Sequence, residues 1–144
     1  MDTTKNIHYF SSFLEFYEYS ISPKLRDIDI FIKTSEGFMN TSEISRLLYI
    51  SDSELSTIMF SRDIRFIDSS NFFDIMECGS SYICKLFFRE KNCGSPYIYT
   101  RKQIAYIYDL DINVVDIICD KLNISKITDY SLRLIFAEIS LEEK

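Results

Sequence analysis

Histidine, glycine and proline are scarce in this sequence of 144 residues, and tryptophan is absent. His8 is the only histidine, and no two of the four cysteines form a CxxC pair, so the sequence lacks the ligands and spacing of a zinc finger. It also lacks a glycine-rich phosphate loop and any order of residues typical of a catalytic triad. We therefore expect no enzymatic activity, no metal and no cofactor.

The low counts of 3 glycines and 2 prolines argue against long disordered linkers, and 47% hydrophobic residues can supply a core. No apolar run approaches the roughly 18 residues that cross a membrane. The first ten residues, MDTTKNIHYF, lack the basic and apolar layout of a signal peptide. We expect an intracellular protein with reduced, buried thiols, in the cytoplasm, the nucleoid or a nucleus, or in the host cell of a virus.

The formal net charge is −6, which opposes binding to a polyanion. Residues 1–91 contain ten Lys and Arg against fourteen Asp and Glu, and residues 92–144 contain six against eight. Neither half of the chain is basic. Binding to DNA would require the positive side chains to gather on one face of the protein.

Residues 40–62 contain the pattern of a helix-turn-helix. Ser45 provides a small side chain where two helices would cross, and Ile50 provides an apolar residue at the turn. Apolar residues recur at helical spacing on both sides of this turn: Ile44, Leu47 and Leu48, then Leu55, Ile58 and Met59. The pattern predicts two short packed helices, with a DNA-recognition helix in second place.

The flanking segments suggest further elements. Residues 6–20 have the apolar spacing of an amphipathic helix, and residues 27–33 alternate as in a half-buried strand. Two β-rich runs around Gly79 predict a hairpin over residues 72–88. The resulting order of helix, strand, two helices and hairpin resembles the winged-helix family. This resemblance implies a recognition helix in the major groove and a wing at the phosphates.

Residues 37–42, GFMNTS, followed by an apolar helix, also resemble the opening of the KilA-N domain of large DNA viruses and phages. That resemblance likewise implies a DNA-binding helix-turn-helix. Members of that family usually carry a tryptophan shortly after this helix, and this chain has none. The richness in Ile, Tyr, Asp and Ser is typical of an AT-rich genome, in such viruses or in low-GC bacteria.

The second half repeats the helix-turn-helix pattern at an offset of sixty residues. Ala105 replaces Ser45, and Leu110, Val115 and Ile118 replace Ile50, Leu55 and Ile58. The agreement is compatible with a duplication and with two copies of a common packing solution. A last helix is expected over residues 130–141. The predicted fold class is α+β, mainly α, with units at residues 1–91 and 97–144 joined by a loop at 92–96.

The expected function is that of a non-enzymatic DNA-binding or transcription-regulator protein with a homodimer contact or another protein partner. Asp52 and Glu54, at the start of the recognition helix, would repel a phosphate. The candidate DNA contacts are Arg46, Ser53, Ser56, Thr57, Arg62, Arg65, Lys85 and Arg89. The candidate protein interface consists of Ile112, Val114 and Ile117, because exposed aliphatic residues on a helix more often mark a protein contact.

A second class of function stays open, that of an acidic module that binds protein and not nucleic acid. Small Bcl-2-like immune modulators of viruses are similar in length, acidity and helix content, and they hold a partner helix in a groove. They contain no β-hairpin. Clear sheet content would favour the winged-helix interpretation, and nearly pure helix would favour the second class.

Overall fold

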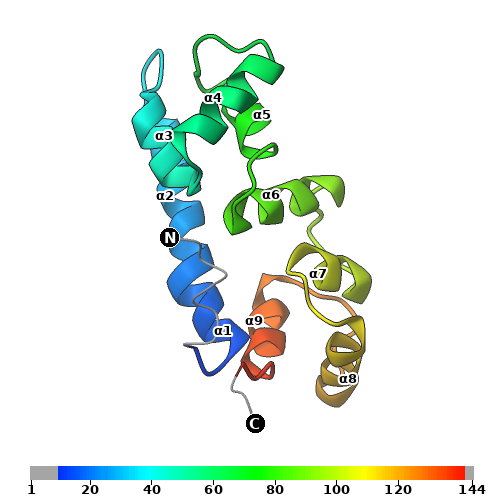
Figure 1. Ribbon diagram of the computed structural model, residues 1–144. Helices are drawn as coiled ribbons and strands as arrows, with labels where there is room; N and C mark the ends of the chain where they lie inside the picture. The colour runs from blue at the N-terminus through cyan, green and yellow to red at the C-terminus, as the bar shows by residue number, and fades with distance from the viewer. Residues whose placement is uncertain (1–9, 142–144) are drawn as a thin grey trace. The chain divides into compact units, whose positions relative to one another are not determined.

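The computed structural model describes residues 10–141 (Figure 1). These residues are mainly helical and contain no β-strand, only two isolated antiparallel bridges, Ser12 with Ser140 and Tyr99 with Ile127. The predicted α+β fold class is therefore wrong. His8 and the start of the helix expected over residues 6–20 lie outside the described residues.

The predicted wing over residues 72–88 is replaced by helix α5 (Phe72–Met76) and most of helix α6 (Tyr82–Asn92). The apolar residues of this segment fit a helix because they bury one face at intervals of three and four residues: Phe72, Ile75 and Met76 on α5, and Ile83 and Leu86 on α6. Gly79 lies buried in the connection between the two helices and not at an exposed hairpin tip. The protein thus has no hairpin wing among its described residues.

The predicted strand over residues 27–33 is part of helix α2 (Ser22–Thr34). Ile28 is buried whereas Ile30 is 51% exposed, so the alternating isoleucines do not share one face. Pro23 lies in the first turn of α2, where its missing N–H is tolerated. Helix α1 (Phe13–Phe16) and the π-helical turn η2 (Tyr17–Ile21) lead directly into α2.

The described residues form two compact units. The first contains residues 20–88, and the second contains residues 10–19 and 89–141. The chain changes unit after Tyr19 and again after Phe88, inside α6. Helix α6 therefore contributes its first turns to one unit and its end to the other.

The first unit contains the predicted helix pair, α3 (Thr41–Leu48) and α4 (Asp52–Ser61), which pack against each other (Figure 1). Asn40 and Ser51 cap the two helices through side-chain oxygens that accept a backbone N–H. Ile44 and Leu48 of α3 and Leu55 and Ile58 of α4 are buried between them and the rest of the unit. The prediction of two short helices at this position is confirmed.

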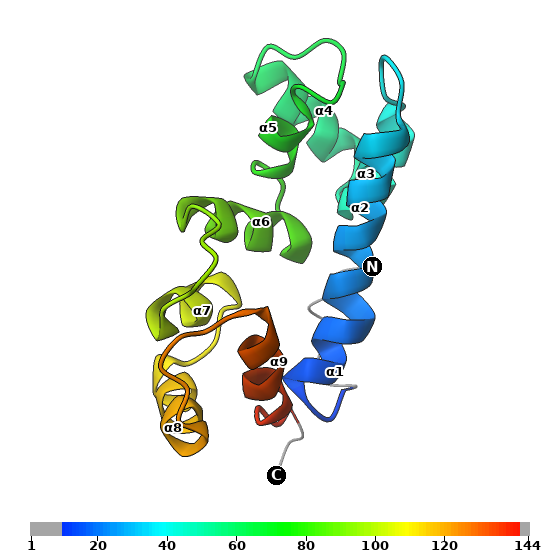
Figure 2. The same ribbon diagram turned by 180° about the vertical axis from the view of Figure 1, so that it is seen from behind.

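The second unit contains α7 (Arg101–Ile107), α8 (Ile112–Leu122) and α9 (Asp129–Ala137) (Figure 2). Helix α1 packs on α9, and the rings of Phe13 and Phe136 lie 4.7 Å apart in an edge-to-face arrangement. The expected helix over residues 130–141 is present as α9, which ends at Ala137.

The backbone of the two units corresponds at the same offset of sixty residues. Met39 N–H donates to the Ile67 carbonyl at 2.7 Å, and Tyr99 N–H donates to the Ile127 carbonyl at 2.8 Å. Residues in the left-handed conformation also correspond, Tyr49 with Asp109 and Asp63 with Asn123. The similarity thus extends from apolar positions to backbone conformation. It spans the helix pair and the loop that follows.

We predict that Gly79→Ala destabilises the first unit. A Cβ atom at this position would lie 2.4 Å from Cys84 Sγ and 3.0 Å from Cys84 Cβ. Overpacking of this kind costs about 1–3 kcal/mol of unfolding free energy, which urea denaturation measures. In a Cys84→Ala background the loss should shrink because the Sγ contact is gone. An equal loss in both backgrounds would contradict this explanation.

Candidate nucleic-acid interface

The turn between α3 and α4 fixes the crossing of the two helices. Tyr49 adopts the left-handed conformation with φ 58°, and Ile50 N–H donates to the Ser45 carbonyl at 3.0 Å. Ser45 is only 5% exposed, and its hydroxyl donates to Asp52 Oδ1 at 2.5 Å. The small residue predicted at the crossing therefore also holds the first residue of α4.

Glu54 is bound in a similar way. Its carboxylate accepts the Ser80 N–H and the Ser80 hydroxyl, both at 2.7 Å. The side chain thus engages the connection between α5 and α6 and is half-buried. The two acids expected to repel phosphate, Asp52 and Glu54, are consequently both hydrogen-bonded inside the first unit.

Most exposed residues of α4 are uncharged, but the helix begins with an exposed acid. Asp52, Ser53, Ser56 and Thr57, which were predicted to point outward, are all exposed. Phe60 continues the same face and is 90% exposed. The hydroxyl groups of this face can donate and accept hydrogen bonds.

Two arginines follow α4. A hydrogen bond with the Cys78 side chain raises the pKa of Arg62, and Glu77 Oε1 lies 3.9 Å from its Nη2. Arg65 is exposed and makes no ion pair with a described residue.

The remaining predicted contacts are dispersed. Arg46 is exposed on α3, where it lines a pocket with Lys24 and Glu43. Lys85 is exposed on α6 within the first unit. Arg89 belongs to the second unit, where its Nε donates to the Ile107 carbonyl at 2.8 Å. Without a wing, Lys85 and Arg89 lose the position from which they were expected to contact phosphates.

Helix α8 presents a different surface from α4. Arg101 forms ion pairs with Asp116 at 3.4 Å and Asp120 at 2.9 Å, so these acids are held against α7. Of the predicted interface residues, Ile112 is half-buried, Val114 is 39% exposed and Ile117 is 67% exposed. The exposed face of α8 is therefore aliphatic and acidic.

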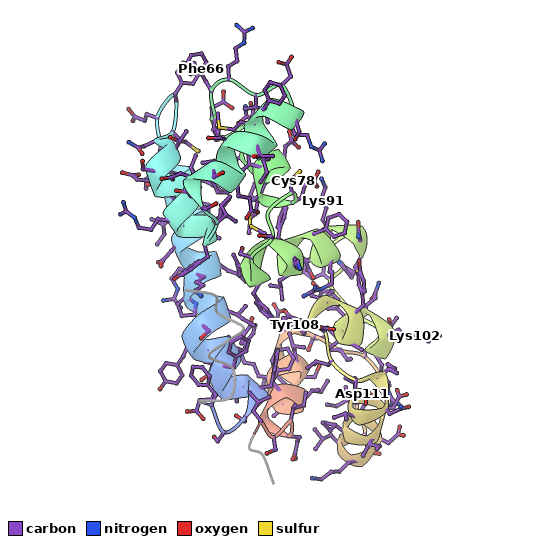
Figure 3. All side chains as sticks on the ribbon, viewed as in Figure 1. Phe66, Cys78, Lys91, Lys102, Tyr108 and Asp111 are labelled. Carbon is purple, nitrogen blue, oxygen red and sulfur yellow. The ribbon has the colours of Figure 1, made fainter. Side chains whose placement is uncertain are left out.

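The second unit contains a groove of about 480 Å³ between the start of α7, α8 and the loop that follows α8. Its lining includes Ile98, Lys102, Ile112, Asp116 and Lys126 (Lys102 is labelled in Figure 3). The corresponding residues of the first unit, sixty positions earlier, are Phe38, Ser42, Asp52, Ser56 and Phe66.

No cluster of three metal-binding side chains occurs among residues 10–141, and no helix in this part of the chain could span a membrane. All four cysteines are free. Cys84 and Cys119 are buried as expected, whereas Cys78 and Cys93 are half-buried. Burial raises the pKa of the Cys84 thiol to about 11, so this side chain stays a neutral thiol.

A scan against models of protein families finds no match to this chain, and searches of curated proteins and of solved structures find none either.

Sequence analysis missed two features of the candidate interface. The bond of Glu54 to Ser80 links residues with no local relation in the sequence, and no pattern signals it. Phe38 and Phe66 stack with their ring centroids 4.7 Å apart, although both lie on the surface. Only their correspondence with Ile98 and Lys126 at the offset of sixty could have placed them together.

We predict that Glu54→Ala lowers the unfolding free energy by about 1–3 kcal/mol, because it removes the acceptor of two hydrogen bonds. Asp27→Ala is the matched control, since it removes an exposed acid from α2 of the same unit. Urea denaturation of both variants measures the difference. Equal stability of the two variants would show that Glu54 is not an internal hydrogen-bond acceptor.

Proposed function

We propose that this chain is a non-enzymatic, DNA-binding protein of the transcription-regulator type, which contacts double-stranded DNA through α4. One observation carries the proposal. The hydroxyl residues Ser53, Ser56 and Thr57 are exposed on α4, where Ser80 holds Glu54 and the exposed Asp52 accepts a hydrogen bond from Ser45.

The chemistry of this face suits the major groove. In a helix-turn-helix the second helix enters that groove, and hydroxyl groups hydrogen-bond to base edges or phosphates. Arg62 and Arg65, which follow α4, supply the positive charges for phosphate contacts. The absence of a wing from the described residues limits the proposed contact to the helix pair and the loop after it.

A protein contact on α8 is the second part of the proposal. Ile117 is 67% exposed on α8, at the position that Thr57 occupies on α4. An exposed isoleucine beside Val114 favours contact with a second copy of the chain or with a protein partner.

The alternative function is that of an acidic protein-interaction module without affinity for nucleic acid. The helical fold of residues 10–141 and the net charge of −6 favour this alternative. The exposed hydroxyl groups of Ser53, Ser56 and Thr57 favour DNA, whereas Phe60, which is 90% exposed on the same face, is an apolar anchor of the kind that protein contacts use. Either function belongs in an intracellular compartment, which we propose as the location.

We predict that the protein binds random-sequence duplex DNA at about 50 mM salt and loses affinity as salt rises. Fluorescence anisotropy over a salt series measures both quantities. Arg62→Glu and Arg65→Glu should each weaken binding, and Arg65→Gln should reduce the salt slope by about one. Lys33→Gln is the control, because Lys33 is exposed but paired with Asp29. Absence of binding at low salt would refute the DNA proposal and favour the interaction module.

We predict that the protein self-associates at high concentration and that Ile117→Asp abolishes this association, because a charge would enter an apolar contact. Light scattering after size-exclusion chromatography measures the mass. Ile30→Asp is the matched control, since Ile30 is 51% exposed on α2. A strict monomer whose mass does not change in Ile117→Asp would rule out the homodimer contact.

A further inference from the structure

The groove of the second unit holds two lysines that have no acidic partner. Lys102 projects from α7 (Figure 3), and Lys126 lies in the loop after α8. Both are exposed, and neither forms an ion pair with a described residue. The other cations described in residues 92–141 are each paired with an acid: Arg101, Lys121 and Arg133. The unpaired positive charge of this stretch is thus concentrated at one groove.

The acid that lines the groove is compensated by an arginine. Asp116 Oδ1 lies 3.4 Å from Arg101 Nη1, and Arg101 Nη2 donates to the Ile124 carbonyl at 3.3 Å. Because the charges of this pair cancel, Lys102 and Lys126 make the groove positive in a protein whose net charge is −6. The groove therefore attracts an anion at short range.

Backbone hydrogen bonds hold two walls of the groove together. Tyr99 N–H donates to the Ile127 carbonyl at 2.8 Å, and Ile127 N–H donates to the Tyr99 carbonyl at 3.3 Å. This antiparallel bridge holds Thr100, which follows Tyr99, beside Lys126, which precedes Ile127. Since the fold fixes these walls, a ligand binds with little loss of backbone conformational freedom.

The rest of the lining suits a ligand that has both an organic part and a phosphate group. Ile98, which is 48% exposed, and Ile112 supply apolar surface. Thr100 and Ser125 supply hydroxyl groups. A lysine ammonium is a compact charge with three N–H donors, which suits a phosphate. The groove volume of about 480 Å³ falls within the roughly 300–1,000 Å³ that small-molecule sites occupy.

The backbone that the two units share does not require these lysines. The first unit has Ser42 at the position of Lys102 and Phe66 at the position of Lys126. Both residues are uncharged, although backbone hydrogen bonds correspond in the two units. The positive charge at these positions is therefore specific to the second unit.

The net charge of the protein distinguishes between a small anion and a polyanion. A polyanion extends beyond the groove and is repelled by the acids around it, since charges act over a Debye length of roughly 10 Å at about 0.1 M salt. A small anion contacts the two lysines at close range and avoids most of this repulsion.

We propose that the groove binds a small organic phosphate, whose phosphate group contacts Lys102 and Lys126 and whose organic part packs on Ile98 and Ile112. The observation that carries this inference is that both unpaired lysines line one groove with apolar walls. The site lies within the second unit, so the inference does not depend on the DNA contact proposed for α4.

The test is isothermal titration calorimetry of the full-length protein with adenosine monophosphate as the probe. We expect saturable binding of this probe, weaker binding of inorganic phosphate, which lacks the organic part, and no binding of adenosine, which lacks the charge. Lys102→Gln/Lys126→Gln should weaken binding of adenosine monophosphate roughly tenfold or more, because two charged hydrogen-bond donors are lost. Lys121→Gln is the matched control, since Lys121 is exposed in the same unit but paired with Glu138.

Other results would overturn the inference. If neither phosphate probe binds, the groove is not a phosphate site. If the double variant, shown to be folded by circular dichroism, binds as tightly as the wild type, or if Lys121→Gln loses as much affinity, binding does not occur at these lysines. If adenosine binds as tightly as its monophosphate, the charge does not drive recognition. No DNA is used, so failure of this inference leaves the proposed function of α4 in place, and the reverse also holds.

Discussion

The crossing of α3 and α4 at Ser45 is the constraint on which the candidate interface depends. A small side chain allows the two helices to approach, and the Ser45 hydroxyl holds Asp52 at the start of α4. Ser51 caps the start of α4, and the bond from Ser45 ties the first residue of α4 to α3. The hydroxyl face formed by Ser53, Ser56 and Thr57 follows from this crossing and from helical spacing.

The hydrogen bonds of Asp52 and Glu54 bear on how the net charge of the protein is interpreted. The net charge of −6 counts Asp52 and Glu54 in the same way as every other acid. A negative net charge opposes DNA binding. In the fold, Glu54 accepts two hydrogen bonds from Ser80 and points toward the connection before α6. Glu54 is therefore engaged by the connection before α6, whereas Asp52 stays exposed at the start of α4, and the protein as a whole is acidic.

The helix pair could be predicted because its signals are local. Apolar spacing, the caps at Asn40 and Ser51 and the turn at Ile50 all lie within one short stretch. The strand over residues 27–33 was predicted wrongly, because three isoleucines at alternate positions fit a strand and only the surroundings of Ile28 select a helix. Gly79 was assigned to a hairpin tip, whereas it accommodates the close approach of Cys84, a contact within the buried core.

The two units share backbone features but differ in their exposed residues. Buried positions agree across the offset of sixty, Ile44 with Ile104 and Ile58 with Ile118, so packing maintains the helix pair in both. Exposed positions are free of that constraint, and they differ: Ser56 corresponds to Asp116, and Phe66 corresponds to Lys126. In the second unit Arg101 forms ion pairs with Asp116 and Asp120 of α8, whereas the first unit has an uncharged threonine, Thr41, at the position of Arg101. This divergence at exposed positions is the basis on which we propose different contacts for α4 and α8.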